Sequence, residues 1–208
     1  MLGQARRGTT QARGRARRLQ LLAAAKELLA EREIDQITLS EVAARAGIPK
    51  SSSYHFYNDM QDLYAELATS LDEELHQLFV EPARAAENWA GIVEEFVRRA
   101  HGYFDANIAA QKLMFGPKAP PSIKSESRRA DRRHSELLER QIDSQFVLPQ
   151  FEDRDRIFFR AVEAMDLMFS LSLIEYDQLS PKMVDEAYRI AVAYLQLYIP
   201  AELPRRML

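Results

Sequence analysis

Apolar residues recur every three or four positions along most of the chain, and strict two-residue alternation is rare. That spacing places apolar side chains along one face of an α-helix, whereas alternation would indicate a strand. Glycine, which interrupts helices, occurs only seven times in 208 residues. The pattern therefore predicts an all-α chain of about nine helices.

The helix boundaries are predicted from capping residues, glycine and proline. Thr38 or Ser40 can cap one short helix, Pro49 can open the next, and residues 116–121 form the clearest break. The expected helices span residues 17–32, 40–46, 50–56, 59–80, 87–106, 107–115, 122–147, 153–177 and 180–199.

The chain divides into three parts. Residues 1–16 are rich in Gly, Thr, Gln and Arg and have little to bury, so we expect a flexible basic arm. Residues 17–64 contain the short helices, and residues 65–208 contain the longer ones. The helices at 153–177 and 180–199 are apolar around most of their circumference. Such helices must be buried on several sides, either at the centre of the fold or against a partner subunit.

Charge is distributed unevenly along the chain. There are 28 Lys and Arg against 31 Asp and Glu, a net charge of −3, yet residues 1–64 carry ten bases against seven acids. A local excess of base indicates an anionic partner for the N-terminal part. The absence of cysteine excludes disulfides and thiolate metal sites. No apolar run approaches ~18 residues, so we expect a cytoplasmic protein without a membrane span.

Residues 38–63, TLSEVAARAGIPKSSSYHFYNDMQDL, hold the most informative pattern. Two short helices flank Gly47, which can take the left-handed conformation of a tight turn, and the small Ala43 allows the helices to cross closely. The second helix is polar and crowded with hydrogen-bonding groups, which suits the DNA major groove better than a protein core. The pattern predicts a helix-turn-helix.

This run resembles the DNA-binding signature of TetR-family transcriptional repressors. The matching positions are Thr38, Val42, Ala43, Ala46, Gly47, Ile48, Lys50, Tyr54, His55, Phe56, Tyr57, Asp62 and Leu63. The resemblance implies a three-helix DNA-binding domain at 17–64 and a larger helical domain for ligand sensing and dimerisation at 65–208. It also implies a homodimeric, sequence-specific repressor that a small molecule releases from a palindromic operator.

The resemblance further implies eight residues that contact double-stranded DNA. We expect base-edge contacts from Lys50, Ser51 and Ser52, phosphate contacts from Thr38, Ser40 and Tyr57, and contacts of either kind from Tyr54 and His55. Two alternatives stay open. Tyr54 could be half-buried packing, and His55 could be a solvated surface residue.

Three positions depart from the signature. Pro49 replaces the usual capping Ser, Ser53 replaces a core Leu or Ile, and Met60 replaces a phosphate-contacting Lys. We expect looser packing of the second helix, or a neighbour such as Phe56 filling the gap. We also expect the loss of one phosphate contact, which the basic arm could offset. A helical interaction protein with degenerate, non-specific DNA binding is therefore the alternative function.

In the larger part, the resemblance implies dimerisation through the last two helices and an effector pocket among the inner faces of the others. Ten large apolar residues are the pocket candidates: Trp89, Phe96, Tyr103, Phe104, Met114, Phe115, Phe158, Met165, Phe169 and Tyr176. Such a lining suits a hydrophobic or aromatic ligand, although stripes of this kind also form plain core.

An enzyme is the other class of function to weigh. The four histidines lack metal-ligand spacing, and the chain has no Gly-rich phosphate loop and no Gly-x-Ser-x-Gly elbow. We therefore expect no catalytic residues, no metal site and no cofactor.

Overall fold

The computed structural model describes residues 2–207, with side chains described from residue 12 onward, so the side chains of Arg6 and Arg7 in the basic arm lie outside the described part. The fold is all-α, as predicted. Apart from one bridge between Phe146 and Arg205, the described residues contain no β-structure. The helices are α1 (Leu2–Glu31), η1 (Ile34–Gln36), α2 (Leu39–Arg45), α3 (Lys50–Ser53), α4 (Met60–Val80), α5 (Trp89–Ala106), α6 (Ile108–Ala110), η2 (Gln111–Phe115), α7 (Pro121–Gln145), α8 (Arg154–Tyr176) and α9 (Pro181–Leu195).

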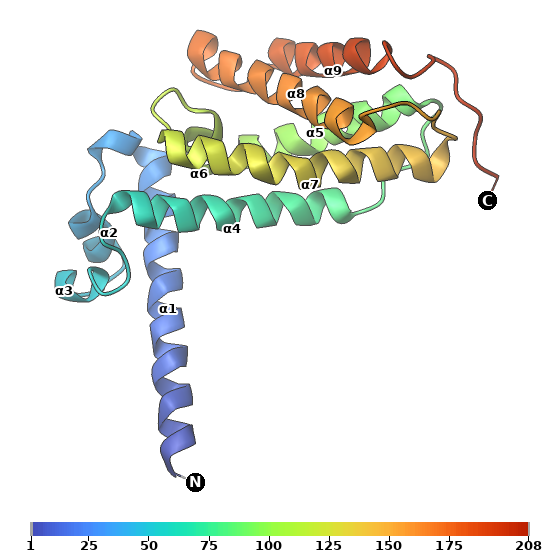
Figure 1. Cartoon of the computed structure of the whole chain (residues 1–208). Helices are drawn as coiled ribbons and strands as arrows, with labels where there is room; N and C mark the ends of the chain where they lie inside the picture. Colours follow the sequence, from blue (N-terminus) through green and yellow to red (C-terminus); the bar gives the residue numbers. More distant parts are fainter. Residues whose placement is uncertain (1, 208) are drawn as a thin grey trace.

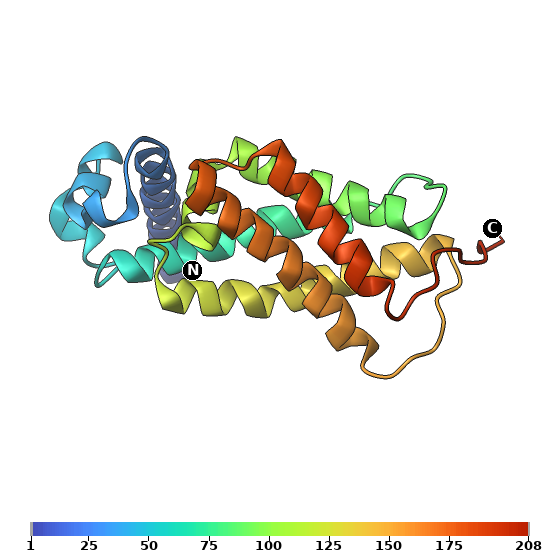
Figure 2. The ribbon, with the colours of Figure 1, turned by 90° about the horizontal axis from the view of Figure 1, so that it is seen from above.

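The longer helices form a layered bundle. Figure 1 shows α4 and α7 side by side, with α8 and α9 stacked beyond α7. Seen from above, α8 and α9 cross the bundle as its outer layer (Figure 2). The short helices α2 and α3 lie at one end, beside the start of α4, while α1 runs crosswise to α4 and projects from the body. Of the helices in residues 2–207, none is long and apolar enough to cross a membrane.

Several helices start at a side chain that accepts a hydrogen bond from the first turn. Thr38, Asp59, Asn88 and Ser180 each accept one from the backbone N–H group three residues further on. Such a cap satisfies a donor that the start of a helix otherwise leaves unpaired. These caps explain why the observed starts of α4 and α9 agree with the predicted ones.

One continuous hydrophobic core runs from α1 to the end of α9. Its fully buried side chains include Leu29 near the short helices and Trp89 and Phe158 among the long ones. The hydroxyl of Tyr64 on α4 also donates a hydrogen bond of 3.1 Å to the carbonyl of Ile34. The short helices and the long ones are therefore packed on a shared core.

The predicted boundaries are wrong in several places, and α9 ends at Leu195 instead of continuing to residue 199. α1 is continuous from Leu2, whereas the sequence pattern starts it at residue 17 after an arm. Gly3, Gly8 and Gly14 each cost roughly 1 kcal/mol in a helix, but extending an established helix needs no new nucleus. α3 ends at Ser53 instead of continuing to Phe56, since the chain turns there toward α4. The segment 107–115 is divided into α6 and a π-helical turn, which the bond from the Gly116 N–H to the Gln111 carbonyl closes.

Candidate nucleic-acid interface and effector cavity

The turn between α2 and α3 has the geometry that its sequence predicts. Gly47 has a φ of +67°, in the left-handed region where glycine carries no steric penalty. The backbone N–H of Ile48 donates to the Ala43 carbonyl at 2.9 Å, and both side chains are buried. This turn fixes α3 across α2 and leaves one side of α3 in solvent.

Four exposed polar residues lie on this side of α3 or directly after its end, and we name them the reading surface: Lys50, Ser51, Tyr54 and His55. Tyr54 is 50% exposed, so its ring is only half available for packing. Ser52 beside them is partly buried. Within the part of the chain that the structure describes, no side chain of the reading surface makes a hydrogen bond or ion pair to the protein. These groups are therefore free to contact another molecule.

The start of α2 is built around a reciprocal cap. The Thr38 hydroxyl accepts from the Glu41 N–H at 3.3 Å and donates to Glu41 Oε2 at 2.7 Å, while Arg32 donates to Glu41 Oε1 at 2.7 Å. The hydrogen bond from Arg32, followed by those from Thr38, lowers the pKa of Glu41 to about 2. Thr38 therefore has a structural role, and it and the partly exposed Ser40 remain candidates for a phosphate.

Tyr57 does not fit its predicted phosphate contact. Its side chain is only 3% exposed, and its hydroxyl is buried without a hydrogen-bond partner among the described residues. The guanidinium of Arg18 lies 5.6 Å from the ring centroid, and burial raises the pKa of the Tyr57 hydroxyl to about 12. Tyr57 packs into the core, and this burial argues against a phosphate contact.

Of the departures from the signature, Ser53 lies inside α3 and Pro49 directly before it, and Ser53 has a local explanation. Ser53 is fully buried, and its hydroxyl donates to the Lys50 carbonyl at 2.8 Å, which satisfies it in an apolar setting. Phe56 is partly buried and packs against the core beside it. Pro49 provides no side-chain cap, as expected, so α3 starts without one.

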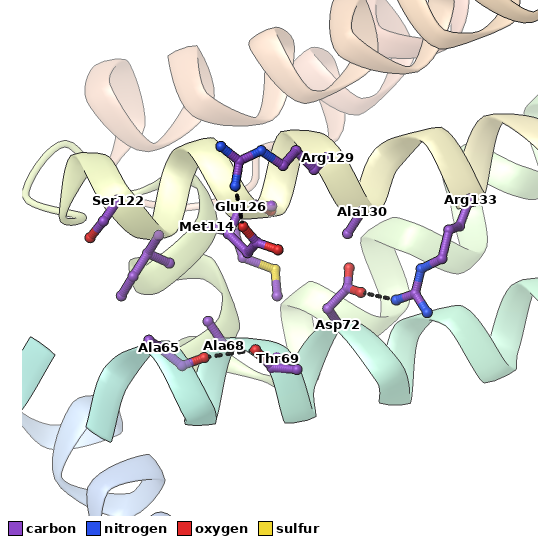
Figure 3. Close-up of a pocket in the computed structure, with 12 residues that line it drawn as sticks. Ala65, Ala68, Thr69, Asp72, Met114, Ser122, Glu126, Arg129, Ala130 and Arg133 are labelled. Atoms are coloured by element: carbon purple, nitrogen blue, oxygen red, sulfur yellow. Dashed lines mark hydrogen bonds and ion pairs between the residues drawn. The ribbon is translucent and has the colours of Figure 1, made fainter. Parts of the chain in front are cut away.

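A groove of about 550 Å³ opens between α4 and α7 (Figure 3). Ala65 and Ala68 line it from α4, and Met114 lies between the two helices. At one end the Arg133 guanidinium on α7 contacts the Asp72 carboxylate on α4 at 2.5 Å and so links the two walls.

Behind the groove lies a smaller inner cavity of about 20 Å³, enough for roughly one water molecule. It shares Asp72, Met114 and Ser127 with the groove. Five phenylalanines line it: Phe79, Phe96, Phe104, Phe115 and Phe169. The groove is thus an open approach to a nearly closed aromatic chamber.

The pocket candidates divide into two sets. Six of them line the inner cavity: Phe96, Phe104, Met114, Phe115, Met165 and Phe169. Four do not. Trp89 Nε1 donates to the Pro200 carbonyl at 2.8 Å, the Tyr103 hydroxyl donates to the Leu71 carbonyl at 2.7 Å, and Phe158 is plain core. Tyr176 is 43% exposed at the end of α8. Helical spacing predicts that all ten face inward, but it does not predict which of them border a cavity.

Sequence reasoning missed the polar lining of the inner cavity: Asp72, Asp131, His134 and Asp166. His134 is 2% exposed, and its Nδ1 lies 3.4 Å from Asp131 Oδ1. Burial, and then the negative charges of Asp131 and Glu163, raise the pKa of Asp166 well above its ordinary value. These residues lie on helices rich in charge of both signs, so no spacing distinguishes them from solvated positions.

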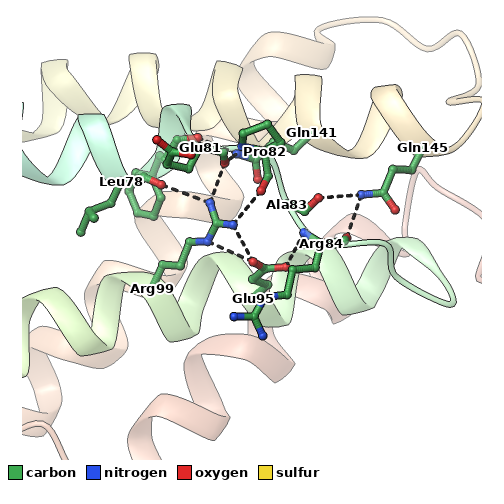
Figure 4. Close-up of polar contacts among 10 residues, drawn as sticks. Leu78, Glu81, Pro82, Ala83, Arg84, Glu95, Arg99, Gln141 and Gln145 are labelled. Atoms are coloured by element: carbon green, nitrogen blue, oxygen red, sulfur yellow. Dashed lines mark hydrogen bonds and ion pairs between the residues drawn. The ribbon is translucent and has the colours of Figure 1, made fainter.

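The far end of α4 is fixed by a polar cluster (Figure 4). Arg99 on α5 donates to the carbonyls of Leu78, Glu81 and Pro82 at 3.1, 2.6 and 2.8 Å. The same guanidinium pairs with Glu95 at 2.6 Å. These bonds anchor the connection from α4 to α5.

Two glutamines of α7 hold the same connection. Gln141 donates to the Phe79 carbonyl at 2.5 Å and to the Glu81 carbonyl at 3.1 Å. Gln145 donates to the Arg84 carbonyl at 2.9 Å and accepts from the Ala86 N–H at 3.0 Å. Three helices therefore meet at this end of α4 through hydrogen bonds to backbone groups.

The outer face of α8 and α9 exposes large apolar side chains. Leu167 and Ile174 on α8 are more than half exposed, and Ile190 on α9 and Leu197 just after it are also exposed. Large apolar residues gathered on one face of a folded chain mark a contact surface.

Comparison with known proteins shows which family this architecture resembles. The model of the bacterial regulatory proteins of the tetR family matches residues 21–67, and the tetracyclin repressor-like C-terminal domain matches residues 87–199. A TetR-family transcriptional regulator from Streptomyces coelicolor is similar in structure, with 22% identity and a TM-score of 0.69 over 88% of this chain and 99% of that one. A TetR transcriptional regulator from Rhodococcus sp. RHA1 has 18% identity and a TM-score of 0.63, over 87% and 96%.

RolR, solved in complex with the ligand resorcinol, has 18% identity and a TM-score of 0.62, over 92% of each chain. No curated protein matches the sequence. The two family models together cover the short helices and most of the long ones, and the second alone covers more than half of the chain. The chain therefore belongs to the TetR family of DNA-binding transcriptional regulators.

Proposed function

We propose that this regulator is a homodimeric repressor that binds a palindromic operator through α3 and is released by a small hydrophobic or aromatic effector. The reading surface carries this proposal. Its Lys50, Ser51, Tyr54 and His55 side chains are exposed and have no partner within the described protein, as base-edge and phosphate contacts require.

The apolar outer face of α8 and α9 supports the dimer. A twofold axis through Leu167 and Ile174 would cover side chains that are exposed in the single chain. Two copies of α3 would then lie about 34–36 Å apart, one turn of DNA. The operator of such a dimer has two inverted half-sites.

The groove of about 550 Å³ has room for a small aromatic effector, and the phenylalanines of the inner cavity beside it offer aromatic contacts, since aromatic side chains pack well against flat apolar molecules. Two structural neighbours point the same way: RolR was solved with resorcinol, and FrrA, at 18% identity and a TM-score of 0.52, is a flavonoid-responsive regulator. Both are relatives in fold, so the effector of this chain is inferred from its own cavity.

Release would follow a shift between two conformations. An effector entering between α4 and α7 would push Ala65 and Ala68 on the part of α4 nearest the helix-turn-helix, while Arg99 holds the far end. The turn η2 offers a second connection. Its Met114 lines the groove, and its Lys112 donates to the Arg32 carbonyl at 2.8 Å. The effector must bind the released form more tightly, because equal affinity for both forms shifts nothing.

Selection of genomic fragments by the purified full-length protein tests DNA recognition. We expect one palindromic site, and we expect Lys50→Ala to weaken its binding about ten- to hundredfold, because a good base contact contributes ~1–3 kcal/mol. Lys124→Ala on α7 removes the same charge away from the reading surface and should bind as the wild type does. A profile that depends on salt but not on sequence would instead favour degenerate, non-specific binding.

A further inference from the structure

The polar lining of the inner cavity is acidic. Asp72, Asp131 and Asp166 face it, and apart from the histidine His134 no cationic side chain lines it. Arg133 reaches Asp72 from the groove. Within residues 2–207, neither Asp131 nor Asp166 forms an ion pair with a lysine or arginine. The described part of the protein therefore pairs these two carboxylates with no lysine or arginine, so a ligand or a proton must balance their charge.

A second observation points to a missing ligand. His134 is 98% buried, and its Nε2 has no hydrogen-bond partner among the described residues. The nearest carboxylate oxygen to this nitrogen, Asp72 Oδ1, is 3.7 Å away, too far for a hydrogen bond. With Nδ1 facing Asp131, the proton is best assigned to Nδ1, which leaves Nε2 as an acceptor. An acceptor nitrogen and an acceptor oxygen at this separation suit a donor group that binds between them.

The remaining walls suit a positive charge as well. Phe79 and Phe96 stack with ring centroids 3.9 Å apart. Phe104, Phe115 and Phe169 meet edge to face, with centroids 4.6 to 6.2 Å apart. The faces of aromatic rings attract cations, and five rings also provide the apolar contact that an organic cation needs.

We propose that an organic ammonium ion binds with its charged N–H head in the inner cavity, among Asp131, Asp166 and His134, and with its aromatic group in the adjoining groove. The proposal rests on the proposed function, because the same cavity is the effector site there. A neutral phenol would satisfy His134 but leave the carboxylates uncompensated, and a carboxylate ligand would be repelled. Met114, which is flexible and lines both spaces, marks the route from the groove.

A cation in this place should release a proton. Burial and the charges of Asp131 and Glu163 raise the pKa of Asp166, and a bound cation opposes that shift by stabilising the ionised carboxylate. The groups around Asp166 are Glu163 on its own helix, Arg128, Asp131 and His134 on α7, and Asp72 on α4. Binding of an ammonium ion should therefore tighten as pH rises through the titration of Asp166 in the free protein, over the range in which the amine itself stays protonated.

Calorimetry on the full-length protein without DNA tests the proposal. The probes are benzylamine, whose ammonium head carries N–H donors and stays protonated at neutral and acidic pH, the neutral phenol resorcinol, and benzoate. We expect the ammonium ion to bind about tenfold more tightly than either of the others, with proton release that appears as a dependence on the ionisation enthalpy of the buffer. Equal or tighter binding of resorcinol, or no binding of the ammonium ion, would overturn the proposal.

Three variants locate the effect. Asp166→Asn and Asp131→Asn are close in shape to the wild type and should each weaken ammonium binding about tenfold, with their folding checked by thermal melts. Asp105→Asn, which removes an exposed carboxylate outside both cavities, should leave it unchanged. Unchanged affinity in both cavity variants would contradict the site. Genomic-fragment selection is a separate experiment, so a failure of DNA recognition and a failure of cation binding can be told apart.

Discussion

The two ends of α4 are held in very different ways. At the Val80 end, Arg99, Gln141 and Gln145 bind the backbone of the following connection. At the Met60 end, one buried hydroxyl of Tyr64 and an exposed ion pair between Arg18 and Glu66 provide the polar contacts. A stiff helix fixed at one end moves most at the other. Under the proposed mechanism, a ligand that pushes Ala65 and Ala68 would therefore displace the end of α4 beside the helix-turn-helix.

The largest effect should come from breaking the fixed end. Arg99→Ala removes three hydrogen bonds to backbone carbonyls and the ion pair with Glu95, so we expect a loss of about 3 kcal/mol in the free energy of unfolding, measured by urea denaturation. Arg98→Ala is the matched control, because Arg98 forms only an exposed pair with Glu94 and should cost about 0.5 kcal/mol. Equal losses in the two variants would remove the contrast between the ends of α4.

A smaller effect is expected at the movable end. Tyr64→Phe removes the hydrogen bond to the Ile34 carbonyl and should lower the free energy of unfolding by about 1 kcal/mol. Tyr54→Phe deletes a hydroxyl of the reading surface that bonds nothing in the described protein, so its unfolding curve should coincide with that of the wild type. If Tyr64→Phe costs as much as Arg99→Ala, this end is not the weaker one.

The smallest effect concerns Glu41, beside the movable end. Its pKa of about 2 in the folded protein lies below the ordinary 4.5, so the ionised form stabilises the fold above about pH 4.5, and that contribution is lost as pH falls toward 2. Glu41→Gln should therefore unfold more easily than the wild type at pH 7, and the gap should narrow in urea curves recorded at pH 5, 4 and 3. A gap of constant size would show that charge at Glu41 contributes nothing.

How far the sequence predicted the molecule also differs between its two parts. In the helix-turn-helix, local rules suffice: Gly47 needs its turn, Thr38 and Asp59 cap their helices, and polar residues face solvent along α3. Tyr57 is the exception there, because its aromatic ring and hydroxyl are compatible with both a core and a phosphate.

The inner cavity was predictable only in outline. Periodicity identifies the inward faces of the long helices, and six candidates do line the inner cavity. It cannot tell that Phe158 fills its space while Phe169 borders a void, because that depends on packing among several helices. The carboxylates were missed for a related reason: Asp131 and Asp166 are remote in sequence and become one acidic site only when α7 packs on α8.

The continuous α1 gives the basic N-terminal segment a defined reach. At 1.5 Å per residue, the fifteen residues from Leu2 to Ala16 form a rod of roughly 22 Å that continues directly into the rest of α1. A helical rod loses little conformational entropy when it meets DNA, whereas a flexible arm must first be ordered. It is also too wide to enter a minor groove, so its arginines would meet phosphates along the outside of the duplex. Because the segment would contact phosphates and no base edges, it would increase the affinity for DNA without changing which operator is bound.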